Sequence, residues 1–222
     1  MAKRGAKAQN KVNIKWSANF AYAIGLIVTD GCLSKDGRHV SFVSKDLDQV
    51  ENYKISLKID NKIGKTYSGF DKKMAHRIQF GDVSFCSFLN DIGITKNKSK
   101  TIGEIKVPNK YFFDFLRGCF DGDGSFYSYW DKRWKSSFMF YTEFVSASKK
   151  HIDWLQSEIF KKIKVSGHIT KGKNNVCYQL KYAKADSLKL LKKMYYKDNK
   201  IHLERKRLKI VKVLGIVGEK LP

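Results

Sequence analysis

Two stretches of the chain repeat one pattern of apolar and small residues. Residues 23–31 read AIGLIVTDG and residues 116–124 read LRGCFDGDG, so each is an apolar run with a central glycine that ends in Asp-Gly. Short side chains recur at every fourth position, on one helix face: Ala21, Gly25 and Thr29 in the first stretch, and Asp114, Gly118 and Gly122 in the second. We expect two helices that approach each other closely through these faces.

The flanking residues indicate where these two helices begin and end. Ser17 is suited to cap the N-terminus of the first helix with its hydroxyl group. The second helix is expected over residues 109–121. Gly31 and Gly124 follow the two stretches and suit a left-handed C-terminal position, which glycine adopts without strain.

Segments with aromatic and β-branched residues in partial alternation follow each helix and predict strands. They cover residues 38–44, 64–69 and 76–80 in the first half and residues 125–130, 137–146, 167–171 and 176–182 in the second. Apolar spacing predicts further helices at residues 47–57, 83–91, 152–163 and 185–196, and a basic helix after residue 200.

The order helix, two strands, helix, two strands, helix thus occurs twice. It predicts an α+β fold of two pseudo-symmetric halves that pack through the glycine-bearing helices, each half with an antiparallel sheet. We expect a basic N-terminal arm at residues 1–16, a first half at 17–94, a linker at 95–108 and a second half at 109–222. The linker boundary rests on Pro108 and on the polar residues before it.

The charge balance favours a polyanionic partner. The 222 residues hold 44 Lys+Arg against 21 Asp+Glu, a net charge of +23. Such a field attracts nucleic acid through phosphate neutralisation and counterion release, whereas an anionic membrane surface or mere solubility are the alternatives. No run reaches the ~18 apolar residues that a membrane span needs. The four cysteines and five histidines show no zinc-ligand spacing, and the cysteines are interpreted as free thiols.

One aspartate closes each repeated stretch, at Asp30 and Asp123. On equivalent helix ends these carboxylates can meet at a two-fold axis, where hard oxygen ligands favour Mg²⁺. Helix C-termini also carry partial negative charge, which favours a cation. The alternative is a pair of helix-end aspartates that only hydrogen-bond nearby turns. Recurrence of the same acid at the same place favours the metal site.

The two motifs resemble those of the LAGLIDADG homing endonucleases in their single-chain form. Lys98-Ser99-Lys100-Thr101, residues 115–118 and Arg205-Lys206-Arg207 extend the resemblance, which covers the chain from about residue 17. It implies a metal-dependent endonuclease that cuts both strands of a long, non-palindromic DNA site as a monomer. The implied cofactor is Mg²⁺ or Mn²⁺, with Ca²⁺ as a non-cleaving substitute. The implied metal ligands are Asp30 and Asp123 with the backbone carbonyls of Thr29 and Gly122.

The resemblance also implies a basic residue near the scissile phosphate in each half. Lys45 and Lys149 match that position, and Lys98 is a further candidate. Each can offset charge in the transition state, although on so basic a chain a given lysine is more often a solvated surface group. Asp121 has Val28 as its counterpart in the first motif, so we expect it to face solvent or a lysine rather than the metal.

Specificity is expected from the strands, because an antiparallel sheet can read base edges in the major groove with alternate side chains. The candidates in the first half are Arg38, Ser41, Lys65, Tyr67, Arg77 and Gln79. The candidates in the second half are Tyr127, Tyr129, Arg133, Lys135, Ser137, Lys171, Lys173 and Gln179.

Two other functions fit the same basic surface. One is an intron RNA maturase, since the resemblance extends to such splicing factors and a maturase can retain both aspartates. The other is a DNA-binding regulator with an inactive nuclease site, against which the intact acid pair argues. In every case we expect an intracellular location, in bacterial or archaeal cytoplasm or an organelle, and no obligate protein partner.

Overall fold

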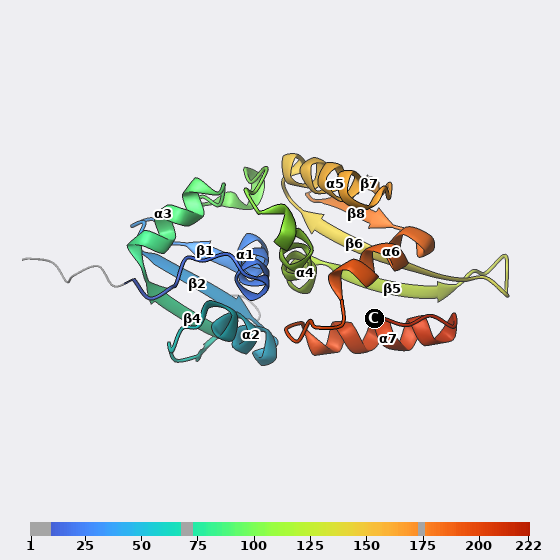
Figure 1. Ribbon diagram of the computed structural model, residues 1–222, viewed down its shortest axis with the longest axis horizontal. Helices are drawn as coiled ribbons and strands as arrows, with labels where there is room; N and C mark the ends of the chain where they lie inside the picture. Colours follow the sequence, from blue (N-terminus) through green and yellow to red (C-terminus); the bar gives the residue numbers. More distant parts are fainter. Residues whose placement is uncertain (1–9, 68–72, 173–175) are drawn as a thin grey trace, which may run out of the picture.

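The computed structural model describes residues 10–67, 73–172 and 176–222 and shows two similar halves side by side (Figure 1). The first half consists of α1 (Ala18–Asp30), β1 (Gly31–Leu33), β2 (His39–Ser44), α2 (Leu47–Leu57), β3 (Gly64–Tyr67), β4 (Met74–Gly81) and α3 (Val83–Asp91). The second half consists of α4 (Phe112–Asp123), β5 (Ser125–Trp130), β6 (Phe138–Ser146), α5 (Lys149–Ile163), β7 (His168–Lys171), β8 (Tyr178–Tyr182), α6 (Lys184–Met194) and α7 (Glu204–Ile216).

Each half contains one four-stranded antiparallel sheet, with the matching orders β1-β2-β4-β3 and β5-β6-β8-β7. In β6 the buried Phe140, Thr142 and Phe144 alternate with residues that are more exposed, Tyr141 and Val145 among them. Such alternation gives each sheet one face toward the helices and one face away from them. The predicted α+β fold of two αββαββα halves is confirmed.

Helices α1 and α4 lie together at the centre of the molecule (Figure 1). The Ser17 hydroxyl accepts from the Phe20 amide at 3.1 Å, which confirms the predicted cap of α1. The two backbones touch at the central glycines. A Cβ atom added at Gly25 would lie 2.9 Å from the Gly118 Cα, and one added at Gly118 would lie 3.0 Å from the Gly25 Cα. Glycine is needed here because backbone atoms cannot rotate aside, as the four-residue spacing predicted.

The prediction that Gly31 and Gly124 adopt a left-handed conformation is wrong. Their φ angles are −79° and −72°, which is extended backbone, because α1 and α4 run directly into β1 and β5. These glycines are required by space instead. A Cβ at Gly31 would lie 2.6 Å from the Ile27 Cα, and one at Gly124 would lie 2.6 Å from the Phe120 carbonyl oxygen.

The segment between α3 and α4 is more than a spacer. It contains a short 3-10 turn (Lys98–Lys100), and its Ile102 and Ile105 side chains are buried in the common core. The Ile102 carbonyl accepts from the Ser148 hydroxyl at the start of α5, so this segment contacts the second half directly. Among the described residues no helix is long and apolar enough to cross a membrane.

Candidate active site

The carboxyl ends of α1 and α4 bring the two predicted metal-binding aspartates to the centre of the molecule. A Cβ added at Gly122 would lie 2.8 Å from the Asp30 Oδ2 and 2.7 Å from the Thr29 Cβ, so the end of α1 rests directly against the end of α4. The Thr29 hydroxyl donates to the Asp30 carboxylate at 3.2 Å. The helix packing, rather than a loop, therefore fixes where Asp30 lies relative to Asp123.

Each aspartate lines its own cavity. The Asp30 cavity has a volume of about 580 Å³. It is lined by Asp30, by Gly122 of the other motif and by Ser41, Val43 and Lys45 of the first half. The Asp123 cavity, of about 140 Å³, is bounded by Asp123, by Thr29 of the other motif and by Val145 and Ser146 of the second half. Each cavity thus combines one aspartate with the residue that precedes the other aspartate. These are the four residues predicted to bind metal.

Burial at this centre disfavours the charged form of both acids. Burial, followed by the negative charge of Asp123, raises the pKa of Asp30 from 3.8 to about 6, against the opposing effects of the Thr29 hydrogen bond and nearby lysines. Burial also raises the pKa of Asp123, while Lys206 and Lys98 act to lower it. A bound divalent cation would offset the repulsion that raises the pKa of Asp30.

Two buried lysines contact the backbone just after the aspartates. The Lys98 ammonium donates to the carbonyl of Gly31, and the Lys206 ammonium donates to the carbonyl of Gly124 at 2.6 Å. Gly31 and Gly124 are equivalent positions in the two halves. The two lysines belong to different elements, yet each contacts the carbonyl at one of these equivalent positions. Burial lowers the pKa of Lys98, and burial lowers the pKa of Lys206 to about 8.

Lys206 is a site residue that the sequence did not single out. Its ammonium nitrogen also lies within hydrogen-bonding distance of the carbonyl oxygens of Phe120, Asp121 and Gly122, at 2.6, 2.8 and 3.1 Å, and shares its three protons among these oxygens and that of Gly124. The Gly122 carbonyl was expected to be a metal ligand, so a lysine already occupies one side of that oxygen. The available signal was the motif Arg205-Lys206-Arg207, which carried the family resemblance without a role for its central lysine.

The structure treats the other two candidate lysines differently. Lys45 is exposed and lines the Asp30 cavity. Lys149 is exposed and forms an ion pair with Asp153 at 2.6 Å, one turn along α5. Helices α2 and α5 begin at Leu47 and Lys149, so the counterpart of Lys45 in the second half is Ala147, which lines the Asp123 cavity. Lys45 therefore lines the same cavity as Asp30, whereas Lys149 lines neither the Asp30 cavity nor the Asp123 cavity.

Two polar residues occupy matching places in the cavities and were also missed. Gln49 of α2 lines the Asp30 cavity, and His151 of α5 lines the Asp123 cavity, each as the third residue of its helix. Gln49 accepts from the Ser44 hydroxyl at 2.5 Å. The His151 Nδ1 lies 2.7 Å from the Gly103 carbonyl, and burial lowers the pKa of His151 to about 4, which keeps the ring neutral. Their chain positions alone gave no signal.

Asp121 does not face solvent, so that alternative is wrong. Its carboxylate is 1% exposed and accepts hydrogen bonds from the Tyr22 hydroxyl at 2.8 Å and from the Leu203 amide at 2.7 Å. Burial raises its pKa, while the charge of Lys206 acts to lower it. The other alternative, a neighbouring lysine, therefore agrees with the structure. Leu203 immediately precedes α7, and Lys206 lies in the first turn of that helix. Asp121 therefore fixes the segment that carries Lys206. The contact with this segment belongs to the second motif, and the first motif has Val28 at the equivalent position.

The predicted base-reading residues do not share one location. Strand alternation places Ser41, Arg77, Gln79, Tyr127, Tyr129 and Gln179 on the sheet faces that point away from the helices. Lys65 and Lys171 pair with His76 and Tyr178. His76 and Tyr178 lie two residues from the buried Ile78 and Leu180 on the same strands, so Lys65 and Lys171 belong to the faces toward the helices. Tyr67 lines the Asp30 cavity.

The remaining candidates lie at strand ends or in turns. Arg38 directly precedes β2, Ser137 directly precedes β6, and Arg133 and Lys135 belong to the turn between β5 and β6. Lys173 lies outside the described residues.

Solved structures show the same architecture. A structure of I-DmoI in complex with DNA and Ca is 14% identical, with a TM-score of 0.57 over 87% of this chain and 97% of that chain. The homing endonuclease I-WcaI bound to its DNA recognition sequence is 17% identical, with a TM-score of 0.58 over 88% of each chain. Full-length DUF199/WhiA from Thermatoga maritima is 14% identical, with a TM-score of 0.55 over 94% of this chain and 71% of that chain.

These matches show that the chain has the fold of the single-chain LAGLIDADG proteins. No protein-family model matches the sequence, and a search of the curated proteins finds no match. At identities of 14% to 17% the likeness is one of fold, so the activity must be argued from the site itself.

Proposed function

We propose that the protein is a site-specific endonuclease that cuts both strands of a long, non-palindromic DNA target with Mg²⁺ or Mn²⁺, acting as a monomer. The observation that carries the proposal is the pair of cavities at the ends of α1 and α4, each with one aspartate and the residue before the other. The net charge of +23 supports a DNA partner. The solved structures I-DmoI and I-WcaI, which share the fold, are bound to DNA.

The donor set fits a divalent metal that also binds substrate. The described residues hold no cluster of three or more His, Cys, Asp or Glu side chains that could bind a metal, so the proposed site offers two carboxylates. Mg²⁺ is commonly bound in this way, through one or two carboxylates with water and phosphate oxygens as the other ligands. Asp30 and Asp123 would hold the metal, with the carbonyls of Thr29 and Gly122 beside them. The bound metal would activate water and stabilise charge at the scissile phosphate.

The basic residues of the site complement this chemistry. Lys98 and Lys206 are buried beside the aspartates and place positive charge where a phosphate approaches. Lys45 adds an exposed ammonium at the wall of the Asp30 cavity. Positive groups held in place before the reaction stabilise negative charge that develops during it, without reorganisation. In this assignment the lysines orient and neutralise the phosphate, and the aspartates hold the metal.

One experiment separates the endonuclease from the maturase. The wild-type protein is incubated with a library of randomised duplex DNA in Mg²⁺ and, in parallel, in EDTA. The proposal predicts cleavage at one long sequence in Mg²⁺ and none in EDTA, with Ca²⁺ supporting binding only. Absence of cleavage with every divalent metal, together with tight binding to the RNA of a surrounding intron, would replace the proposal with the maturase.

A further inference from the structure

The sheet faces that point away from the helices differ in chemistry between the two halves. Thr142 of β6 points to the helices, because its hydroxyl lies 2.5 Å from the Ser187 hydroxyl of α6. Strand alternation therefore turns Tyr141 and Val145 to the opposite face. Val145 lines the Asp123 cavity, so this face continues from the proposed active site.

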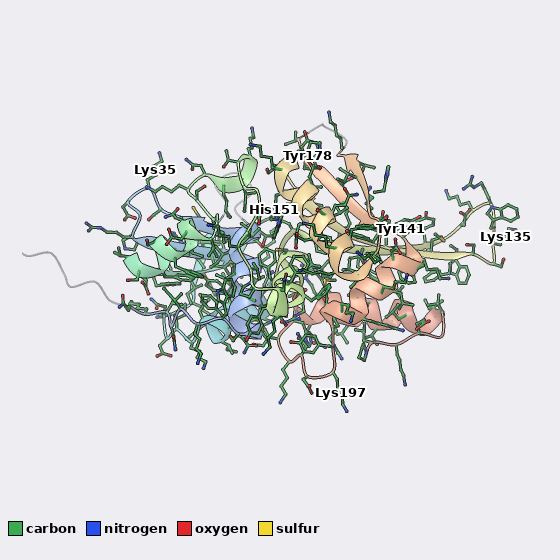
Figure 2. All side chains as sticks on the ribbon, turned by 45° about the horizontal axis from the view of Figure 1, so that its top comes forward. Lys35, Lys135, Tyr141, His151, Tyr178 and Lys197 are labelled. Carbon is green, nitrogen blue, oxygen red and sulfur yellow. The ribbon has the colours of Figure 1, made fainter. Side chains whose placement is uncertain are left out.

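Four residues form a continuous patch on this face, which we call the tyrosine patch: Tyr127, Tyr129, Met139 and Tyr141. Tyr127 pairs directly with Tyr141 across β5 and β6, and their rings stack with centroids 5.2 Å apart. Tyr129 stacks on Tyr141 from the next row, with centroids 6.1 Å apart, and remains 45% exposed. Tyr141 lies between the hairpin tip near Lys135 and the centre of the molecule near His151 (Figure 2).

Charge on this part of the face is neutralised locally. The Glu143 carboxylate is 6% exposed and lies 3.6 Å from the Lys181 ammonium, its cross-strand neighbour. The corresponding face of the first sheet presents three hydrogen-bonding candidates, Ser41, Arg77 and Gln79. The second sheet presents one, Gln179, beside the tyrosine patch. The two sheets therefore offer different chemistry to the two halves of one DNA target.

The base edges in the major groove differ in the same way. Arginine pairs with the acceptors of guanine and glutamine pairs with adenine, whereas the C5 methyl of thymine is the group that apolar side chains contact. From this match we propose that the half-site under the second sheet is rich in thymine, with thymine methyls packed on the tyrosine patch. The inference rests on the proposed function, because it takes duplex DNA as the partner.

Strand spacing sets the length of the thymine-rich segment. Residues two apart on a strand are separated by about 6.6 Å, which is about two base-pair steps of ~3.4 Å. Tyr127 and Tyr129 therefore span two or three consecutive base pairs. Because β5 begins next to Asp123, this segment lies a few base pairs outward from the cleavage point.

The stacking of the rings favours duplex DNA over a single strand. Proteins that bind single-stranded nucleic acid stack bases on open aromatic faces. Here Tyr141 stacks with both Tyr127 and Tyr129, with interplanar angles of 14° and 10°, so ring faces are occupied within the patch. Ring edges and hydroxyl groups are then the parts that meet the groove.

The test selects bound duplexes from the randomised library with wild-type protein in EDTA, so that binding is read without cleavage. The expected result is thymine enrichment over two or three adjacent positions in one half-site alone. Replacing those thymines by deoxyuridine removes only the methyl groups and should weaken binding about fourfold per methyl, the ratio that corresponds to ~0.8 kcal/mol for one buried methylene-sized group. Tyr129→Ser should lose this sensitivity, and Tyr129→Phe should keep it.

Two controls keep the outcome interpretable. Gln79→Ala should alter base preference in the other half-site and leave the deoxyuridine effect unchanged. The thermal midpoint of Tyr129→Ser should stay near that of the wild type, since the ring is half exposed. Equal binding of thymine and deoxyuridine duplexes, absence of thymine enrichment, or preference for single-stranded RNA of equal length would overturn the inference. Thymine preference without cleavage in Mg²⁺ would instead refute the proposed nuclease and leave the base preference standing.

Discussion

Substitution of Gly118 by alanine tests the packing on which the whole site depends. The added Cβ would lie 3.0 Å from both the Gly25 Cα and the Tyr22 carbonyl carbon, and closer still to the Tyr22 carbonyl oxygen. All three atoms belong to the backbone of α1, so no side-chain rotation relieves the contact. Helices α1 and α4 must separate, and the two aspartates at their ends must move with them.

The expected loss of stability follows from two opposing effects. Overpacking of a filled core costs about 1–3 kcal/mol, and the upper end applies because the obstacle is backbone. Alanine in place of glycine within a helix returns up to about 1 kcal/mol. The net loss is about 2 kcal/mol, which for a chain of this size lowers the thermal midpoint by roughly 4–8 °C.

Thermal and urea unfolding of the metal-free protein measure this effect, with Gly215→Ala as the matched control. Gly215 lies in α7, and a Cβ added there has no heavy atom within 4 Å. The control should gain up to about 1 kcal/mol, because only the helix propensity changes. If Gly118→Ala were as stable as Gly215→Ala, the close approach of α1 and α4 would be refuted.

Three further predictions concern the charged residues of the site. Lys206→Met should lower the cleavage rate by about 10²-fold or more, while DNA affinity falls only a few-fold. The control Lys209→Met changes an exposed lysine of the same helix and should cut at the wild-type rate. Equal cleavage rates for the two variants would remove Lys206 from the site. Lys45→Ala should slow cleavage more than Lys149→Ala, since only Lys45 lines a cavity with an aspartate, and single-turnover rates that rank them the other way would reverse that assignment. Burial raises the pKa of Asp30 in the folded protein to about 6, from 3.8 for a carboxyl group in water. The folded state therefore binds this proton more tightly, and the metal-free protein should lose up to about 3 kcal/mol of stability as the pH rises from about 4 to 6. Urea titrations should show this dependence weakened in Asp30→Asn, and an unchanged slope would argue against a buried Asp30 carboxylate.

Long, strongly patterned elements could be predicted from the sequence. Helix α3 and strand β5 have the predicted bounds, because their apolar spacing and flanking residues are unambiguous. Strand β1 was missed, since three residues are too few to show alternation. The glycines after the motifs were assigned the wrong backbone conformation, because spatial crowding and a left-handed turn both select glycine and the sequence does not distinguish the two.

The candidate site could be predicted from the sequence only where a residue recurs. Asp30 and Asp123 stand out because the same acid closes both repeats, and the structure places them on adjoining helix ends. Lys206 comes from α7, which has no counterpart among the described residues of the first half, so no repetition singled it out among the 44 basic residues. The burial of Asp121 depends on contacts with Tyr22 and Leu203, which lie 99 and 82 positions away in the chain.

The most direct test of the central claim compares DNA binding and DNA cleavage in Asp30→Asn and Asp123→Asn on one duplex selected by the wild type. Asp91→Asn, an exposed position at the end of α3, serves as the matched control. The two aspartates are assigned to metal rather than to base contacts, so both variants should bind within a few-fold of the wild type and lose double-strand cleavage in Mg²⁺. Full double-strand cleavage by either variant would contradict the two-aspartate metal site.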